Sequence, residues 1–511
     1  MFVFIVVYFI SIDFVDLHDY VYFDTRILIE LLNLININMG KSRRNFIKSS
    51  VAGATGLFVT VNGINTAVAE KASVCLESGN KSKRTSVDDS YSGGARISES
   101  GALYTPGEID GMTMKELQED YKNRIFDLYL PFWDKGGYDK EFGGFMCELK
   151  DDGSVVNDEK YIWYQGRGIW VYSFLYNYFG KDKRYIEIAE KSREFLVKNM
   201  YLGEGKWRES VNRKGQPVSS TVSQGSAQDI YGALFAATGL VELYKATGNE
   251  EDLSLVKKSI WASVKAYEDP AYDGVRVEGV NKKGLRTQGH SFVMMSVLTN
   301  LLSFHKDAEL EELQKEHVYH LMNHFWNPEY GIVNEDLYHD YSRIPGFEPV
   351  MYSGHSLEAL WMIMDEALRI NDHNLFEVCK GRLRRVMEMT WDYVFGGFCT
   401  EFYYVFGKSG KCPGPEYDTK VMWAHTELLI ATMKIYEITG EEWAKDWYER
   451  GREFSLKYLA NTGHGVWREA VDRFGENQKR PGISVYRKDN FHLIRYLMTN
   501  YLALDRMIKR T

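Results

Sequence analysis

Hydrophobic residues recur at helical spacing through most of the chain beyond residue 110. Within 357–368 and 421–436 the core-type positions are separated by steps of one, three, four or seven residues, as on one face of a helix. The first stretch contains Leu357, Leu360, Trp361, Met364 and Leu368, and the second contains Val421, Leu428, Leu429, Thr432 and Tyr436. This pattern predicts a chain built mainly of α-helices.

Short glycine-containing turns interrupt these helical stretches at a regular interval. Their central residues are Gly144, Gly205, Gly274, Gly331, Gly397 and Gly465, which lie 57 to 69 residues apart. That interval holds two helices of ordinary length with their connections. Segments 206–213 and 466–473 are also related in sequence. Internal duplication of a helix pair is the simplest explanation.

Six such units supply twelve helices. A helix pair cannot bury both of its faces alone, whereas six pairs can do so by closing into an inner and an outer ring. We therefore expect an all-α fold, an (α/α)6 barrel of six helix pairs. Short alternating stretches such as 398–405 predict small β-hairpins at one rim. An open solenoid of the same units is the alternative architecture.

The first hundred residues follow a different pattern. Arg43 and Arg44 precede a weakly apolar stretch at 51–61 and a small-x-small sequence at 67–69, which are the parts of a twin-arginine export signal. We expect cleavage after Ala69 and a periplasmic location for the folded domain.

Four segments follow from this pattern. Residues 39–69 are the predicted signal peptide, 70–108 a Ser- and Gly-rich disordered linker, and 109–511 the barrel domain. Because residues 1–38 do not fit an export signal and Met39 offers a start, we interpret 1–38 as a gene-start artefact. The alternative is a membrane anchor at residues 1–10. This apolar run has only about half of the ~20 residues that a span needs.

Composition and charge exclude several classes of function. The 511 residues are 44% hydrophobic and carry a net charge of -9 without an extended basic stripe, which argues against a nucleic-acid partner. The chain has neither a P-loop nor a dinucleotide-binding fingerprint. Its five cysteines form no C-x-x-C pair, so a zinc ribbon is not indicated, although Cys399 and Cys412 could close a short bridge.

Polar residues of catalytic types occur at one phase of the repeat. Counted from the turn glycine of its own unit, each of five lies 23 to 27 residues further along, and His290 lies 16 residues along. In a closed ring, equal phase means equal height, so these side chains should converge at one end of the barrel. Buried polar groups are costly there unless they serve a site. The five are Arg167, Asp229, His355, Lys420 and His492.

Four segments near this phase carry recognisable motifs. They are 161–170 (YIWYQGRGIW), 353–361 (SGHSLEALW), 420–427 (KVMWAHTE) and 491–495 (FHLIR). In this order they resemble the N-acylglucosamine 2-epimerase and cellobiose 2-epimerase family, over about residues 110–507. The resemblance implies an (α/α)6 barrel that acts on the open-chain form of a reducing-end sugar. The implied reaction is 2-epimerisation or aldose-ketose isomerisation, without a metal or redox cofactor.

The residues of these motifs suit that chemistry. Inversion at C2 through a cis-enediolate needs acid/base groups on both sides of the carbon, and histidines titrate near neutral pH. We expect His355 and His492 to be this pair, with Glu358 and Glu427 orienting or tuning them. Arg167 would hold the developing oxyanion. The predicted substrate-binding residues are Trp163, Trp423, Asp229, His290, Arg495 and Lys420.

Two departures from the family pattern leave the sugar open. Segment 287–295 contains His290 but lacks a His-x-His sequence, and His425 stands where family members often carry Gln. Both positions are expected near the pocket. The expected partner is a mono- or disaccharide, with neither nucleic acid nor a membrane after signal cleavage, and a homodimer is compatible with the sequence.

Other interpretations remain open from the sequence. A glycoside hydrolase on the same barrel would use two carboxylates, Asp229 with Glu427 or Glu358. A periplasmic glycan-binding protein would use aromatic side chains alone. A third group, His317, His320 and His324, shares one helical face, but no carboxylate accompanies it at ligand spacing, so we predict a packing or solvated face and no metal site.

Overall fold

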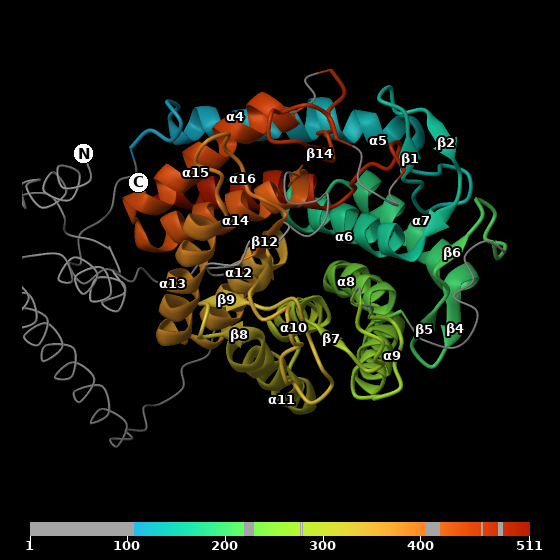
Figure 1. Cartoon of the computed structure of the whole chain (residues 1–511). Helices are drawn as coiled ribbons and strands as arrows, with labels where there is room; N and C mark the ends of the chain where they lie inside the picture. The colour runs from blue at the N-terminus through green and yellow to red at the C-terminus, as the bar shows by residue number, and fades with distance from the viewer. Residues whose placement is uncertain are drawn as a thin grey trace, which may run out of the picture. The chain divides into compact units, whose positions relative to one another are not determined.

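The computed structural model describes residues 107–218, 229–275, 277, 279–403, 419–460, 463–478 and 484–510. The signal peptide and nearly all of the linker predicted from the sequence lie outside these residues. Within them, two kinds of helix alternate along the chain. Figure 1 shows one kind around the centre of the molecule and the other outside it, as expected for an (α/α)6 barrel.

The inner ring consists of six helices. They are α6 (Ile162–Tyr178), α8 (Ile230–Thr247), α10 (Gln288–Leu302), α12 (Ser353–Ile370), α14 (Met422–Thr439) and α16 (His492–Arg510). The outer ring consists of α4 (Met114–Asn123) with η1 (Arg124–Tyr129) and α5 (Leu130–Gly136), α7 (Lys183–Met200), α9 (Glu250–Tyr267), α11 (Ala308–Tyr319) with η2 (His320–Phe325), α13 (His373–Thr390), and α15 (Glu442–Phe454) with η3 (Ser455–Leu459). The η segments are π-helical.

The two rings differ in how their helices begin. Outer helices α4, α7, α9, α11 and α13 start at side-chain caps, such as Asp182 before α7 and Asn249 before α9. Inner helices α6, α10, α12 and α14 start without a side-chain cap. Their first N–H instead donates to a backbone carbonyl of another segment, as Ile162 does to Glu209 at 2.8 Å. Polar side chains in these first turns are therefore not needed as caps.

Short antiparallel strands make these connections. Four pairs link the residues before an inner helix to the residues after the following outer helix: β3 (Lys160–Tyr161) with β6 (Ser210–Val211), β7 (Arg286–Thr287) with β10 (Asp336–Leu337), β11 (Val350–Tyr352) with β12 (Glu401–Tyr403), and β13 (Lys420–Val421) with β14 (Ala470–Val471). Local pairs are β1 (Glu148–Leu149) with β2 (Val155–Asn157), β4 (Tyr201–Gly203) with β5 (Lys206–Trp207), and β8 (Trp326–Asn327) with β9 (Ile332–Val333). The sequence predicted a local hairpin at 398–405. Within that segment β12 instead pairs with β11, the strand that precedes α12.

The ring closes between its last and first units. Gly205 has φ 73° and leaves no room for a Cβ because the carbonyl of Lys258 in α9 lies against it. Gly465 has φ 72° and lies in the same way against the carbonyl of Leu128 in η1, the first outer helix. The ring of Phe179, the C-cap of α6, and that of Tyr501, in the middle of α16, lie 5.2 Å apart. These contacts confirm the closed barrel and exclude the open solenoid.

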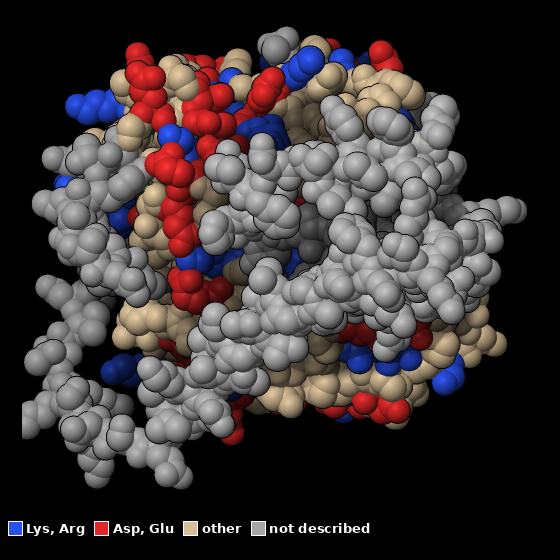
Figure 2. All heavy atoms as spheres, turned by 60° about the vertical axis from the view of Figure 1, so that its left-hand side comes forward, with Lys and Arg blue, Asp and Glu red and all other residues tan. Residues whose placement is uncertain are grey.

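The surface carries both signs of charge. On the face shown in Figure 2, acidic and basic side chains of the described residues are interspersed. Of the helices in the described part of the chain, none combines the length and the apolar character that a bilayer crossing requires. Cys147, Cys379 and Cys399 are free, buried thiols, and Cys412 lies outside the described residues.

Candidate active site

The predicted site residues gather where the inner helices begin. We call the first two turns of the six inner helices the N-terminal rim. Asp229 is the N-cap of α8, and the other residues lie in the first two turns of α6, α10, α12, α14 and α16. The exception is Lys420, which lies in β13. The residues of the rim are Trp163, Arg167, Asp229, His290, His355, Glu358, Trp423, Glu427, His492 and Arg495.

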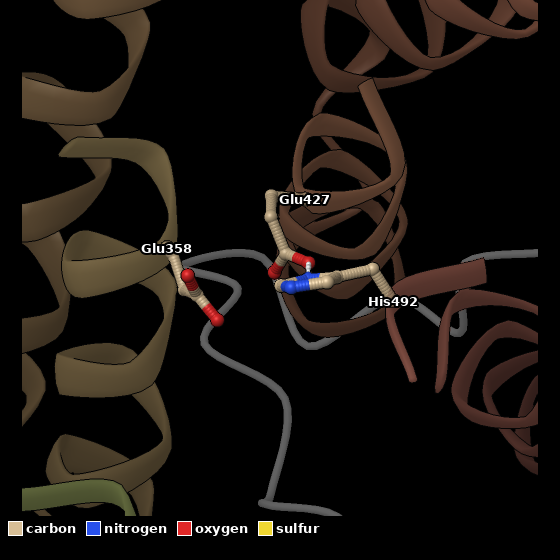
Figure 3. A group of neighbouring side chains, drawn as sticks. All are labelled: Glu358, Glu427 and His492. Atoms are coloured by element: carbon tan, nitrogen blue, oxygen red, sulfur yellow. Dashed lines mark hydrogen bonds and ion pairs between the residues drawn. The ribbon is translucent and has the colours of Figure 1, made fainter. Parts of the chain in front are cut away.

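His492, Glu427 and Glu358 form the most compact group of the rim. Figure 3 shows their side chains pointing toward one another from α16, α14 and α12. Nδ1 of His492 donates to Oε1 of Glu427 at 2.9 Å, and the ring is 8% exposed. The Trp361 indole also donates to Glu427, at 2.9 Å. Glu427 therefore fixes the imidazole so that Nε2 is the nitrogen free to meet a substrate.

Arg495 places a positive charge between the two carboxylates. Its Nη2 atom donates to Glu358 and to Glu427 at 2.6 Å each, and it lies 3.3 Å from Nδ1 of His492. Burial alone would raise the pKa of Glu427, but Arg495 and His492 outweigh it and lower that pKa to about 2. A metal could be held by oxygen and nitrogen atoms grouped as closely as those of Glu358, Glu427 and His492. Here the guanidinium supplies the cation.

Arg495 was predicted to bind substrate hydroxyls. Both of its carboxylate partners are buried, and its own side chain is 5% exposed. This places the guanidinium behind His492 as part of the support of the histidine. We therefore assign Arg495 an orienting function.

His355 has a carboxylate partner of its own. Nδ1 of His355 donates to Oε1 of Glu335 at 2.8 Å, and Glu335 also accepts from Gln288 Nε2 at 2.8 Å. Burial favours the neutral ring, but the charge of Glu335 and this hydrogen bond raise the pKa of His355. Glu335 was missed by the sequence reasoning, because it precedes β10 rather than standing in one of the four motifs. A usable signal was its position in the repeat, four residues after the turn glycine, where Glu209 and Glu469 also stand.

Trp423 brings the two histidines into one site. Its indole lies 5.0 Å from the His355 ring and 5.7 Å from the His492 ring, measured between ring centroids. The sum of these two distances is the upper limit on the separation of the imidazoles. Both rings also offer the same atom, Nε2, because a carboxylate holds each Nδ1.

Arg167 has no acidic partner within ion-pair distance among the described residues. Its guanidinium lies over the rings of Phe235 at 4.1 Å and Phe491 at 5.3 Å, and its Nε is buried without a hydrogen bond. Burial lowers its pKa, with Asp489 acting in the opposite direction. A desolvated guanidinium with unused donors can hold an anionic oxygen.

Trp163 and Asp229 form a pair on the α6 and α8 side of the rim. The indole Nε1 donates to Oδ2 of Asp229 at 2.8 Å, and Trp163 is 38% exposed. Burial raises the pKa of Asp229, while the Trp163 hydrogen bond acts against it. The hydrogen bond fixes the orientation of an indole whose surface is open to solvent, as a sugar-stacking platform requires.

His290 is deeply buried in the first turn of α10. Its ring lies 4.5 Å from that of Tyr231, and its Nδ1 has no hydrogen-bond partner. Burial lowers the pKa of His290 to about 3, so the ring is neutral near pH 7. It can donate or accept a hydrogen bond but does not supply a charge.

The predicted role of Lys420 in substrate binding is corrected by its position. Its ammonium is fully buried and pairs with Asp392 at 2.9 Å, close to the Gly397 turn. Lys160 makes the same contact in the first unit, with Asp139 at 2.9 Å and the Gly143 carbonyl at 2.7 Å. Lys420 therefore anchors a repeat turn and has no free donor facing a sugar.

His425 is likewise structural, whereas we expected it near the pocket. Its Nδ1 donates to the Val421 carbonyl at 2.7 Å, and its Nε2 accepts the Phe398 N–H at 3.0 Å. Burial lowers its pKa to about 3. In the first unit Gln165 does the same: it donates to the carbonyl of Tyr161 at 3.0 Å and accepts the Phe145 N–H at 2.7 Å. The residue that departs from Gln at position 425 therefore supports a repeat turn.

Two further features lie apart from the histidine pair. Among His317, His320 and His324, burial lowers all three pKa values, and Tyr341 contacts His320 and His324. This is the packed face expected from the sequence. A cavity of about 710 Å³ lies between residues 150–152, 464–469 and 484–488. Neither His355 nor His492 lines it.

Comparison with known proteins gives one family. The family model for N-acylglucosamine 2-epimerase (GlcNAc 2-epimerase) matches residues 143–493, which is more than half of the chain. The N-acylglucosamine 2-epimerase of Mus musculus is 26% identical over 373 residues, covering 69% of this chain and 84% of that protein. The cellobiose 2-epimerase of Bacteroides fragilis is 22% identical over 395 residues, covering 70% of this chain and 91% of that protein.

Solved structures show the same fold. The structure of cellobiose 2-epimerase from Spirochaeta thermophila matches with a TM-score of 0.64 and 19% sequence identity. The match covers 77% of this chain and 98% of that one. At this level of identity the likeness concerns the barrel itself.

Proposed function

Because the chain belongs to the N-acylglucosamine 2-epimerase family, we propose that it is a sugar 2-epimerase or aldose-ketose isomerase in which His355 and His492 transfer the proton. The observation that carries this proposal is the arrangement around Trp423. Two imidazoles lie within 5.0 and 5.7 Å of one indole, and each has its Nδ1 bound to a carboxylate. Such a pair can act on the two sides of a single carbon.

The proposed reaction begins with the open-chain sugar. One histidine removes the C2 proton through Nε2, and the C–H electron pair forms the C1–C2 double bond while the carbonyl oxygen becomes negative. The intermediate is a cis-enediolate where C2 carries a hydroxyl group and the corresponding enolate where C2 carries an N-acyl group. Arg167 is suited to hold that oxygen, because its guanidinium is desolvated and has no acidic partner within ion-pair distance among the described residues. The other histidine then returns a proton to C2 from the opposite face.

The ketose-forming reaction uses the same intermediate. If the C2 hydroxyl proton moves to O1 and a proton is returned to C1 instead of C2, the carbonyl group forms at C2, so the product is a ketose and no epimer forms. The names of the relatives, N-acylglucosamine 2-epimerase and cellobiose 2-epimerase, make N-acylglucosamine and cellobiose the first two sugars to test. Trp163, held by Asp229, is the proposed stacking surface for the sugar.

Isotope exchange in D2O tests the proposal. The purified protein is incubated with mono- and disaccharides, and deuterium at C2 is measured by NMR together with new epimers and ketoses. We expect His355→Asn and His492→Asn to reduce exchange at least about 100-fold. Full exchange in both variants would refute the roles of the histidines.

The same assay separates the competing functions. A glycoside hydrolase would produce new reducing ends, and a glycan-binding protein would bind sugar without turnover. The hydrolase alternative receives less support, because the family model that matches residues 143–493 is that of N-acylglucosamine 2-epimerase.

A further inference from the structure

Three glutamates occupy one position of the repeat. Glu209, Glu335 and Glu469 directly precede β6, β10 and β14. Their backbone carbonyls accept the first N–H of α6, α10 and α14 at 2.8, 2.9 and 2.9 Å. The backbone at this position is thus used alike in all three units. The three carboxylates differ in what they contact.

The carboxylate of Glu335 binds a histidine. Apart from Nδ1 of His355, its hydrogen-bond donors are neutral: Gln288 Nε2 at 2.8 Å and Thr287 Oγ1 at 3.2 Å. The carboxylate of Glu469 accepts the Asp489 N–H. Glu335 therefore has no cation near it within the described residues unless His355 is protonated.

The partner of His492 is in the opposite situation. Glu427 already binds the guanidinium of Arg495 at 2.6 Å, and that guanidinium lies 3.3 Å from Nδ1 of His492. The guanidinium is shared between Glu427 and Glu358. Unlike Glu335, Glu427 therefore has a permanently charged partner besides its histidine.

We propose that Glu335 is a positioning residue that keeps the proton on His355, so that the free enzyme holds His355 as the imidazolium acid. The catalytic meaning of this assignment rests on the proposed function. The protonation state of His355 is a property of the free protein and can be measured without a substrate.

The other groups around the two rings are consistent with this assignment. His355 is faced by the rings of Phe292, Tyr352 and Trp423 and by the carboxylates of Glu358 and Asp336. Burial and the charge of Glu335 raise the pKa of Asp336 to about 8, so Asp336 is mainly protonated at pH 7. Glu335 is then the charged member of this acidic pair.

The groups around His492 carry both signs of charge. Besides Glu427 and Arg495, a carboxylate oxygen of Glu358 lies within 4.8 Å of a ring nitrogen of His492, and Asp489 accepts the backbone N–H of His492 at 2.6 Å. Glu358 is bound to the same guanidinium. Phe491 contacts both the His492 ring and the guanidinium of Arg167.

In the proposed reaction each histidine changes its charge once per turnover. His492 takes the C2 proton of the substrate and becomes positive, while His355 gives its proton to the opposite face of C2 and becomes neutral. The product therefore carries a proton that came from His355, and water must restore both histidines before the next turnover in the same direction. Each epimerisation in D2O should accordingly place one solvent deuteron at C2.

The Glu335→Gln variant tests the assignment, with Glu209→Gln as the matched control at the equivalent repeat position. In ¹⁵N-histidine-labelled protein, the His355 ring is identified by its loss in His355→Gln, and its titration is followed by NMR. We expect the midpoint to fall by about one to three pH units in Glu335→Gln. In Glu209→Gln it should not move.

The pH profile of kcat/KM supplies a second readout. The basic limb reports the acid that must stay protonated, so it should move to lower pH in Glu335→Gln, with kcat at pH 8 reduced about 10-fold or more. Glu335→Asp keeps the charge and should retain most of the raised midpoint.

An unchanged His355 titration in folded Glu335→Gln, or a shift of His492 instead, overturns the proposal. A shifted titration in a protein without sugar turnover would refute the proposed function and leave the proton assignment standing.

Discussion

At the level of single residues, Arg495 determines how His492 is held. Its guanidinium is the common partner of two buried carboxylates. In Arg495→Met both carboxylates lose their cation, and removing one partner from a buried ion pair costs about 3–5 kcal/mol. We expect a loss of this size in the free energy of unfolding, measured by denaturant titration at pH 7.

An exposed pair supplies the control for this experiment. Arg384 and Glu388 form a surface pair on α13, with side chains 49% and 47% exposed. Arg384→Met should change the free energy of unfolding by about 1 kcal/mol or less. Equal losses in the two variants would show that Arg495 is not the structural centre of the group.

His425 offers a second test at this scale, because the repeat contains its replacement. Gln165 makes the same two hydrogen bonds in the first unit. We therefore expect His425→Gln to retain sugar turnover and to change the free energy of unfolding by about 1 kcal/mol or less. His425→Leu leaves the Phe398 N–H unsatisfied and should cost about 1–3 kcal/mol. Thermal unfolding and the exchange assay measure both effects, and loss of turnover in a stable His425→Gln would point to a role in catalysis.

At the level of elements, the turn glycines close the barrel. Gly465 combines a left-handed backbone with direct contact to the Leu128 carbonyl. At Gly463, two residues earlier, no other atom lies within 4 Å of the position that a Cβ would take. Gly465→Ala should therefore lower the free energy of unfolding by at least about 2 kcal/mol, from αL strain and the shift of η1.

Gly463→Ala is the matched control and should be nearly neutral. Both variants can be compared by denaturant unfolding. Equal stabilities would mean that the contact between the last turn and the first outer helix does not hold the ring closed.

At the level of the whole molecule, the segment before the barrel makes a separate prediction about location. We propose that residues 39–69 direct export of the folded protein through the twin-arginine pathway. A fusion of this segment to a reporter should appear in the periplasm of a bacterial host, and Arg43→Lys with Arg44→Lys should keep it in the cytoplasm. Export of the double variant at the normal level would refute this route.

The repeat and the closed barrel could be predicted from the sequence because their signals are local. Helical spacing of apolar residues and recurring turn glycines are read along the chain. The same signals placed His355 and His492 near inner-helix starts. The structure confirms the barrel and puts both residues in the first turns of α12 and α16.

The number of residues from the turn glycine predicted the positions of single side chains less reliably. Lys420 and Arg167 lie equally far beyond their turn glycines, yet Arg167 is inside α6 and Lys420 precedes α14. The connection between turn and inner helix is longer in the unit of Lys420. A count along the chain cannot correct for that difference.

The sequence by itself thus determined six helix pairs and placed the two histidines near inner-helix starts, because periodic burial and turn geometry depend on neighbours along the chain. Closure of the ring was decided by contacts between its last and first units. Only the tertiary structure decided which carboxylate each histidine binds. Glu335 reaches His355 through the pairing of β7 with β10, and Glu427 shares Arg495 with Glu358 across three inner helices. These partners are 20 to 137 residues apart in sequence, and packing of the barrel brings them together.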